Sequence, residues 1–450
     1  MIRRSFLKSC ALTLGASVVS VPAFCQTRNP SEKLNVAHVG VGGMVGDFHL
    51  QGSATENKLG LCDIDDDILN KASAAWPTAK RYADWRVMLD ELGDQLDGVI
   101  ITAPDHVHAC AATAFMDRGI HCYCEKPLAH DIWQIRQMQK KAKEKNLITQ
   151  MGTQVHASSN YRRAVELVQS GAIGKVSDVQ VWCGVVWGGQ PATKLNVLPP
   201  KSVHWDLWIG PAPMRSYQPC YLSGNRDAYR RLECDIDVPK TCYLSGNWRC
   251  WWDFGAGGIG DMGCHLIDLP FWALGLTYPK TIESSSPQAV DADHCPKDLV
   301  CKYTFTQSDG SPLTLTWSDG DLRPEILKKW GIPEKSYGIL FVGAEGALYV
   351  NYAEHFLLPR DKFADFKTPE ATIPDSPGHH AEWFNAIRSG KRTTCDFDYS
   401  GKVSETILLG TFAYRAGKKL EYDAETMTAA NCPEADRYFK QPYRNGWGLK

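Results

Sequence analysis

The chain lacks any long block of charge of one sign. Its 450 residues carry 49 Lys and Arg against 51 Asp and Glu, a formal net charge of -2. Such a balance leaves no electrostatic footprint for nucleic acid or for an anionic membrane surface. Internal repeats and low-complexity segments are also absent. We therefore expect an ordinary globular protein that binds a small molecule and no nucleic acid.

Metal-ligand spacing is missing as well, although the sequence has 16 cysteines. No C-x-x-C pair or Cys/His set has the spacing of zinc ligands, so we expect no metal site. Cys122 and Cys124 fall on an apparent strand, where alternation points both sulfurs to one face. If the protein is exported, some cysteines could form disulfides of unknown connectivity. The first candidates are clustered in one loop-like region: Cys220, Cys234, Cys242 and Cys250.

The apolar stretch at residues 11–24 is too short and too rich in small residues for a stable membrane span. It follows a basic start, an order typical of a targeting segment. The string Arg3-Arg4-x-Phe6-Leu7-Lys8 resembles a twin-arginine export signal. We predict that residues 1–30 are such a signal, recognised by the twin-arginine export machinery, and that the protein is periplasmic or otherwise exported. An ordinary secretion signal and, because of Cys25, a lipoprotein signal remain alternatives.

The first half of the chain alternates strands and helices. Apolar runs at 34–39, 59–62, 98–102, 120–124 and 147–151 are separated by helical segments, which predicts a doubly wound parallel sheet, a Rossmann domain. The first run is followed by a glycine loop typical of dinucleotide binding, although Val45 holds the third glycine slot and Gly46 comes one residue late. The loop residues that we expect to bind the cofactor are Gly40, Gly42, Gly43 and Met44.

Ligands of such sheets bind outside the carboxyl ends of the strands. Asp63 follows the second strand, where a carboxylate accepts hydrogen bonds from the adenosine ribose and repels a 2′-phosphate, so NAD is favoured over NADP. Asp65 is the reserve candidate, and a helix cap is the alternative role of Asp63. The other strand ends supply the remaining cofactor candidates: Thr102, Pro104, Asp105, His108, Glu125, Lys126 and Gln154.

The second half has period-2 patterns typical of strands with one buried face. The pairs 300–306 with 313–317 and 338–343 with 347–351 flank turn residues and predict an open, largely antiparallel sheet. Residues 188–260 are rich in Gly, Pro, Trp and Tyr and too long for a simple connection, which indicates functional loops. The substrate candidates from this half are His156, Arg249, Trp251 and Trp252.

Asp261 and His265 are four residues apart and therefore share one face of a helix that Asp261 is predicted to open. An imidazole suits the removal of a hydroxyl proton near neutral pH, so both residues are candidates for catalysis and for substrate binding. A helix-capping aspartate and a core histidine are the structural alternatives.

Together these strings resemble the Gfo/Idh/MocA oxidoreductases, named for glucose–fructose oxidoreductase and inositol dehydrogenase. The strings are Gly40-Val-Gly42-Gly43, Cys62-Asp63, Pro104-Asp105-His106-x-His108, Glu125-Lys126-Pro127 and Asp261-Met-Gly-Cys-His265. The resemblance implies an NAD(P)-binding Rossmann domain at 31–152 and an α+β substrate and oligomerisation domain at 153–450. It also implies catalysis by Lys126, Asp261 and His265, a cis peptide before Pro127, and a homo-oligomer.

These expectations converge on an NAD(P)-dependent oxidoreductase that transfers hydride from a sugar or polyol hydroxyl. Fifteen Trp and 17 Tyr add weak support for a carbohydrate ligand, because aromatic faces pack on sugar C–H surfaces. One alternative is a glycosidase or lyase that oxidises its sugar transiently with a tightly bound, recycled NAD. Another is a sugar-binding protein that has lost catalysis.

Overall fold

The computed structural model describes residues 32–189, 198–218, 246–333 and 335–449. The predicted signal segment at 1–30 and three of the disulfide candidates, Cys220, Cys234 and Cys242, lie outside the described residues. The fourth, Cys250, is buried, as are the other described cysteines. Within the described ranges, no helix combines the length and the apolar character needed to cross a membrane.

The N-terminal half forms the predicted Rossmann sheet, with strand order β3-β2-β1-β4-β5-β6 and parallel pairing throughout. Its central strands are apolar and buried on both faces, as a parallel sheet with helices on both sides requires. The strands are β1 Asn35–Val39, β2 Asn57–Cys62, β3 Lys80–Tyr82, β4 Gly98–Ile101, β5 His121–Cys124 and β6 Thr149–Met151. The helices are α1 Gly43–Gly52, α2 Asp66–Ala75, α3 Trp85–Leu92, α4 Asp105–Asp117 and α5 Ile132–Glu144.

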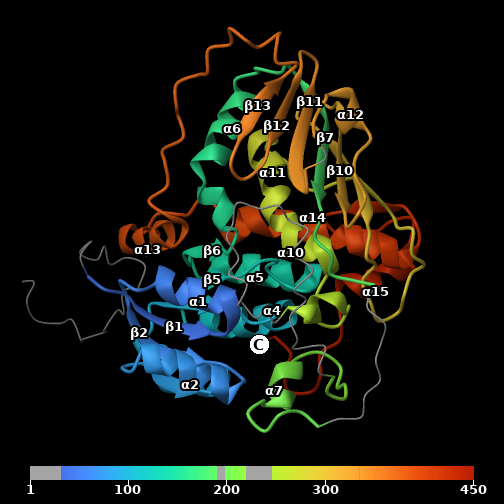
Figure 1. Cartoon of the computed structure of the whole chain (residues 1–450). Coiled ribbons are helices and arrows are strands. Elements are labelled where there is room, and N and C mark those ends of the chain that lie inside the picture. The colour runs from blue at the N-terminus through green and yellow to red at the C-terminus, as the bar shows by residue number, and fades with distance from the viewer. Residues whose placement is uncertain (1–31, 190–197, 219–245, 334, 450) are drawn as a thin grey trace, which may run out of the picture.

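One helix from the far end of the chain completes this half. α13, His379–Ser389, packs on the Rossmann sheet (Figure 1). Trp383 and Phe384 join Val36 and Ile100 in one buried cluster, and the Trp383 indole N–H donates to the Ile148 carbonyl at 3.3 Å. The first sheet therefore receives part of its cover from residues far beyond its own sequence range.

The C-terminal half holds a nine-stranded sheet in the order β13-β12-β11-β7-β10-β9-β8-β14-β15. β7 and β10 are parallel and the other neighbours are antiparallel, which confirms the expected largely antiparallel sheet. The strands are β7 Val176–Cys183, β8 Thr281–Ser285, β9 Val300–Thr306, β10 Pro312–Asp319, β11 Tyr337–Gly343, β12 Ala347–Val350, β13 His355–Leu358, β14 Leu420–Asp423 and β15 Thr428–Ala429.

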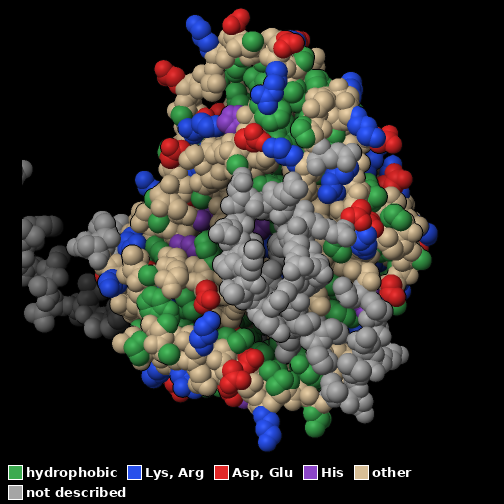
Figure 2. Space-filling model, in the orientation of Figure 1, with side chains coloured by type: hydrophobic (Ala, Val, Ile, Leu, Met, Phe, Trp, Pro, Cys, Tyr) green, Lys and Arg blue, Asp and Glu red, His purple; other side chains and the backbone are tan. Residues whose placement is uncertain are grey.

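The two faces of this sheet differ. The inner face packs against α6 Ser159–Gln169, α10 Gly257–Leu266 and α14 Phe397–Ala416 (Figure 1). On the outer face, Glu283, Lys302, Thr316 and Gln180 stand side by side across four strands. Near β11 and β12, α12 Ile326–Lys329 and its flanks cover that face. Acidic and basic side chains are interspersed on the face of the molecule shown in Figure 2.

The helix expected to open at Asp261 begins earlier and is broken. α10 starts at Gly257, where φ is +69°, and α11 spans Asp268–Leu274. A Cβ on Gly258 would lie 2.8 Å from Oδ2 of Asp319 on β10, so this glycine allows the helix to approach the sheet closely. The glycine-rich run that reads as a loop is thus the first turn of α10, and Asp261 lies inside the helix rather than at its cap.

The remaining described elements are short. They are the 3₁₀ turns η2 Gly93–Gln95, η3 Gln154–Ala157, η4 Asn247–Cys250 and η5 Pro433–Ala435, and the helices α7 Trp205–Ile209 and α15 Asp436–Phe439.

Candidate active site

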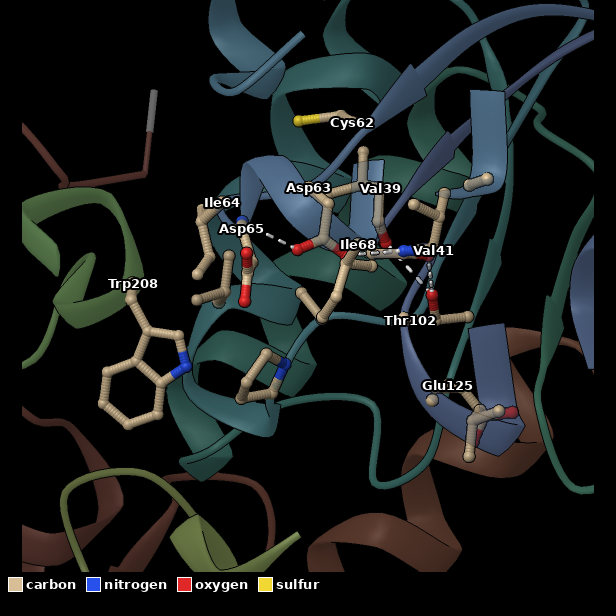
Figure 3. Close-up of a pocket in the computed structure, with 18 of the residues that line it drawn as sticks. Val39, Val41, Cys62, Asp63, Ile64, Asp65, Ile68, Thr102, Glu125 and Trp208 are labelled. Atoms are coloured by element: carbon tan, nitrogen blue, oxygen red, sulfur yellow. Dashed lines mark hydrogen bonds between the residues drawn. The ribbon is translucent and has the colours of Figure 1, made fainter. Parts of the chain in front are cut away.

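A cavity of about 790 Å³ opens at the carboxyl ends of β1, β2, β4 and β5 (Figure 3). This volume falls within the range of about 300–1,000 Å³ typical of small-molecule sites. All but one of the predicted cofactor residues line it: Gly40, Gly42, Gly43, Met44, Asp63, Thr102, Pro104, Asp105, His108, Glu125 and Lys126. The exception is Gln154, which is exposed at the start of η3 and is not among the lining residues.

The glycine loop is shaped for a close approach of backbone to ligand. Gly40 has φ of +86°, and a Cβ there would lie 2.8 Å from the Thr102 carbonyl carbon. A Cβ on Gly46 would lie 2.4 Å from the Val41 carbonyl carbon. Gly46 therefore allows α1 to approach the loop after β1 closely, the kind of contact that the third glycine provides, one residue later than usual. The Thr102 hydroxyl donates to the Gly40 carbonyl and fixes the turn.

Asp63 sits where a ribose-binding carboxylate is expected. One oxygen accepts from the Val41 N–H at 2.9 Å and the other from the Asp65 N–H at 3.1 Å (Figure 3). Burial raises the pKa of Asp63 to about 6. The cap of α2 is Asp65, whose carboxylate accepts from the Asp67 N–H at 3.0 Å, so the helix-cap alternative for Asp63 is wrong. A carboxylate here, beside the glycine cradle, fits the ribose of NAD.

Lys126 and Asp261 bring the two domains together. Lys126 Nζ donates to Asp261 Oδ1 at 2.8 Å and to its main-chain oxygen at 2.7 Å. The Lys126–Pro127 peptide is cis, as the resemblance implies. The buried imidazole of His108 bridges the Pro127 and Ala103 carbonyl oxygens at 2.8 and 2.6 Å and so ties this turn to the end of β4.

Asp261 is surrounded by donors in addition to Lys126. The Trp187 indole N–H donates to Oδ2 at 2.6 Å, and Arg249 Nε lies 3.2 Å from Oδ1. Both residues line the cavity. Three donors around one buried carboxyl stabilise its charged form. Arg249 is one of the substrate candidates, whereas Trp187 is absent from the sequence-based set, because it follows β7 without any motif.

His265 lies one turn along α10 from Asp261 and is 6% exposed. Burial, and next the charge of Lys126, lower the pKa of His265 to about 3. Its Nδ1 has no hydrogen-bond partner among the described residues. Neither His265 nor Asp261 is among the lining residues, but Asp261 is hydrogen-bonded to Lys126, which lines the cavity. The imidazole is therefore neutral near pH 7, and its unprotonated nitrogen can accept a hydrogen bond.

Behind Glu125 runs a buried chain that the sequence does not signal. Glu125 Oε1 accepts from His49 Nε2 at 2.8 Å, and His49 Nδ1 lies 2.8 Å from Nε2 of His380 on α13. Burial opposes the charge on Glu125, but the His49 hydrogen bond and nearby cations outweigh it and lower its pKa to about 2. This chain orients the carboxylate next to Lys126.

The remaining substrate candidates lie away from the cavity. His156 Nδ1 bonds Asp268 at 2.9 Å, and its ring stacks on Trp272 at 4.1 Å. His156, Asp268 and Cys395 are close enough together to hold a metal ion, although the Asp268 carboxylate already accepts from His156 and from the Tyr399 hydroxyl. Trp251 and Trp252 are buried but do not line the cavity. The tryptophans of this region that do line it are Trp208 and Trp248.

Two family models match the chain. The model described as "Oxidoreductase family, NAD-binding Rossmann fold" covers residues 34–153. The model described as "Oxidoreductase family, C-terminal alpha/beta domain" covers residues 240–449. Both are Gfo/Idh/MocA models, and the chain belongs to the Gfo/Idh/MocA oxidoreductase family.

Individual relatives are distant. Levoglucosan dehydrogenase of Pseudarthrobacter phenanthrenivorans is 24% identical over 136 residues, 30% of this chain and 34% of that protein. A glycosyl hydrolase family 109 protein of Stenotrophomonas maltophilia is 28% identical over 203 residues, 40% of this chain and 41% of that protein. The chain thus spans about a third to two fifths of the length of these curated relatives.

A solved structure shares the fold over nearly the whole described chain. The WlbA dehydrogenase from Bordetella pertussis, in complex with NADH and UDP-GlcNAcA, superimposes with a TM-score of 0.57 at 16% identity. The match covers 87% of this chain and 99% of that one. At this level of identity, the likeness shows a shared fold.

Proposed function

We propose that the protein is an NAD-dependent oxidoreductase that acts on a hydroxyl group of a sugar or polyol. The observation that carries the proposal is the contact of Lys126 with Asp261, with His265 one helical turn away, at the edge of a cavity built on a dinucleotide-binding loop. NAD rather than NADP is favoured by Asp63, since a carboxylate repels a 2′-phosphate.

The residues divide the work as follows. Gly40, Gly42 and Gly43 would hold the pyrophosphate of NAD and Asp63 its ribose, and the bound cofactor would supply the acceptor for a hydride. His265, neutral at physiological pH, accepts the proton of the substrate hydroxyl.

Lys126 has three N–H donors, of which Asp261 receives two. The third remains for the substrate oxygen, whose developing negative charge the ammonium stabilises. Asp261, held by Trp187 and Arg249, keeps Lys126 in place. This arrangement supports proton removal and charge stabilisation at one substrate hydroxyl.

The test is His265→Asn in the full chain. It should reduce turnover of an oxidisable sugar or polyol at least a hundredfold, because general-base catalysis contributes about 10²–10⁴-fold, and leave NAD affinity unchanged. His355→Asn, on β13 and outside the cavity lining, is the matched control. Unchanged turnover in His265→Asn would remove His265 from the mechanism.

A second candidate is favoured by the match to the family 109 glycosyl hydrolase protein, which spans more of this chain than the levoglucosan dehydrogenase match. Here a sugar hydroxyl is oxidised transiently, the adjacent C–H proton is removed, the glycosidic bond is eliminated and the hydride is returned. The same residues serve both reactions. Purified protein given an aryl glycoside without added NAD would release the aryl alcohol without net NADH only in this second case.

We also propose that residues 1–30 direct export by the twin-arginine machinery, so that the protein works in the periplasm with NAD bound tightly before export. The Arg3-Arg4 motif is the support. Replacing both arginines by lysine should keep the protein in the cytoplasm, as cell fractionation would report.

The proposed homo-oligomer is tested separately by analytical ultracentrifugation of the purified chain.

A further inference from the structure

Residues 198–218, which include α7 and are named here the α7 segment, lie over the Rossmann domain although they follow β7 of the other sheet (Figure 1). The Asp66 N–H donates to the Ser202 carbonyl at 2.9 Å, and the His204 N–H donates to the Ile64 carbonyl at 2.8 Å. His204 Nε2 also lies 3.1 Å from Asp66 Oδ1. The α7 segment is therefore tied to the loop that follows β2, the loop that begins with Asp63.

An aromatic side chain of the α7 segment faces the cavity. Trp208 lines the cavity and stands across it from Ile64 and Asp65 (Figure 3). Its ring stacks on Trp205 at 4.7 Å and meets Phe254 edge-on at 4.7 Å, and its carbonyl oxygen lies 3.0 Å from His106 Nε2. These contacts fix the indole.

The C-terminal tail, residues 443–449, holds the α7 segment from outside. Arg444 donates from Nε to the Gly210 carbonyl at 2.9 Å and from Nη2 to the Asp206 carbonyl at 2.8 Å, and it forms an ion pair with the Asp206 carboxylate. Its own N–H donates to the Pro211 carbonyl at 3.0 Å. From the same tail, Trp447 lines the cavity, with the Arg86 guanidinium 4.2 Å from its ring centre.

We propose that the α7 segment and the C-terminal tail form a clamp over the adenosine end of the dinucleotide and retain it. The covered end is the one bordered by Asp63, where the ribose binds in this fold. Planar adenine gains from the aromatic surfaces of Trp208 and Trp447. Release of the nucleotide requires the clamp to open and the Arg444 contacts to break.

The clamp rests on the proposed function, since it presupposes NAD in the cavity, and it deepens that function. A slowly exchanging cofactor suits an enzyme that returns its NAD to the starting redox state in each turnover. Arg444 is a positioning residue in this proposal, because it acts through the α7 segment and does not line the cavity.

The experiment measures NAD dissociation from the full-length protein. Protein loaded with NAD is separated from free nucleotide, and bound NAD is followed over time by mass spectrometry. Arg444→Ala should raise the dissociation rate about tenfold or more, because charge-assisted, multidentate contacts act mainly on dissociation. Asp206→Asn, which changes a largely exposed side chain, should raise it less. Arg437→Ala, an exposed arginine of α15 outside the clamp, is the matched control and should leave the rate unchanged.

The outcomes separate the two proposals. Faster release from Arg444→Ala and Asp206→Asn, with Arg437→Ala unchanged, supports the clamp. Wild-type protein that binds NAD but releases it as fast as the Asp206→Asn and Arg444→Ala variants overturns the clamp and leaves the proposed function standing. Wild-type protein that binds no NAD overturns both. Should Arg444→Ala fail to fold, the comparison of Asp206→Asn with Arg437→Ala decides alone.

Discussion

The six-stranded and nine-stranded sheets both serve the site, but by different means. The parallel sheet brings its strand ends into the cavity, where Gly40, Thr102 and Glu125 line the wall. No lining residue belongs to a strand of the nine-stranded sheet in the described part of the chain; that sheet instead supports α10, which carries Asp261 and His265. The parallel sheet contributes through the shape of its backbone, and the nine-stranded sheet contributes through the side chains that pack against α10.

Substitutions in the two sheets should therefore impair the protein in different ways. A change in the glycine cradle should remove cofactor binding directly, because the ligand meets main chain there. A change in the second sheet should act through the stability and position of α10, and spare the cradle. Variants in each region test whether the two sheets act independently.

Gly46→Ala should have the largest effect. Its Cβ would lie 2.4 Å from the Val41 carbonyl carbon, a contact with backbone that cannot move without distorting the loop. We expect NAD binding to be lost and stability to fall by about 3 kcal/mol. Isothermal calorimetry with NAD and chemical unfolding check both. Lys367→Ala, at an exposed position outside the cavity lining, is the control. Normal NAD affinity in Gly46→Ala would contradict a cradle shaped by backbone contact.

Leu315→Ala on β10 should come next. Leu315 is fully buried on the inner face of the nine-stranded sheet, whereas its neighbour Thr314 points to the outer face. Truncation of a buried leucine costs about 2–5 kcal/mol, and Thr314→Ala should cost about 0.5 kcal/mol. Denaturant unfolding measures both, and NAD affinity should survive in the folded fraction of each. Loss of NAD affinity in Leu315→Ala alone would show that the two sheets are not independent.

Sequence periodicity sufficed for most elements, because strands with one buried face and amphipathic helices carry local signals. The packing partners of each element were harder to predict. The partners of α13 in the N-terminal half, such as Ile148, lie more than two hundred residues away in sequence, and no local pattern encodes that contact. The sequence does not predict the start of α10, because glycine disfavours a helix. Gly258 is nevertheless required there, since α10 approaches Asp319 closely.

The sequence predicts the residues of the site where a motif marks the end of a strand. It also predicts them where the family resemblance assigns a function to a residue. The resemblance named Lys126 and Asp261 together, and the structure joins them. Tryptophans in aperiodic loops carry no such signal. Trp251 is predicted to lie at the substrate and is packed in the core, whereas Trp187, which nothing in the sequence distinguishes, donates a hydrogen bond to the Asp261 carboxylate.

Trp187→Phe tests that missed residue and should have an intermediate effect. Phenylalanine keeps an aromatic ring but removes the donor 2.6 Å from Asp261 Oδ2, and an unmet buried acceptor costs about 1–3 kcal/mol. We expect kcat/KM to fall about ten- to a hundredfold. Trp252→Phe removes a comparable bond, to the Asp291 carbonyl at 3.1 Å, outside the cavity lining. Equal losses of kcat/KM in both variants would make the Trp187 effect structural.

The smallest effect concerns a buried carboxyl at the start of α4, where the two halves meet. Burial raises the pKa of Asp105 from 3.8 to about 8; Arg249 and Lys126 oppose this rise, and Asp261 and Glu125 reinforce it. Between these two values the folded chain holds a proton that the unfolded chain has lost. The free energy of unfolding therefore falls as the pH rises from about 4 to about 8.

Asp105→Asn carries no titrating proton and should lose less stability over that interval. The difference between wild type and variant should change by about 1.4 kcal/mol from pH 6 to pH 7, since each pH unit between the two pKa values corresponds to about 1.4 kcal/mol. Denaturant unfolding at each pH measures it. Asp67→Asn, on the exposed first turn of α2, is the control and should follow the wild type. Parallel pH profiles for wild type and Asp105→Asn would mean that Asp105 is ionised in the fold, held by Lys126 and Arg249 as a further part of the charged cluster around Asp261.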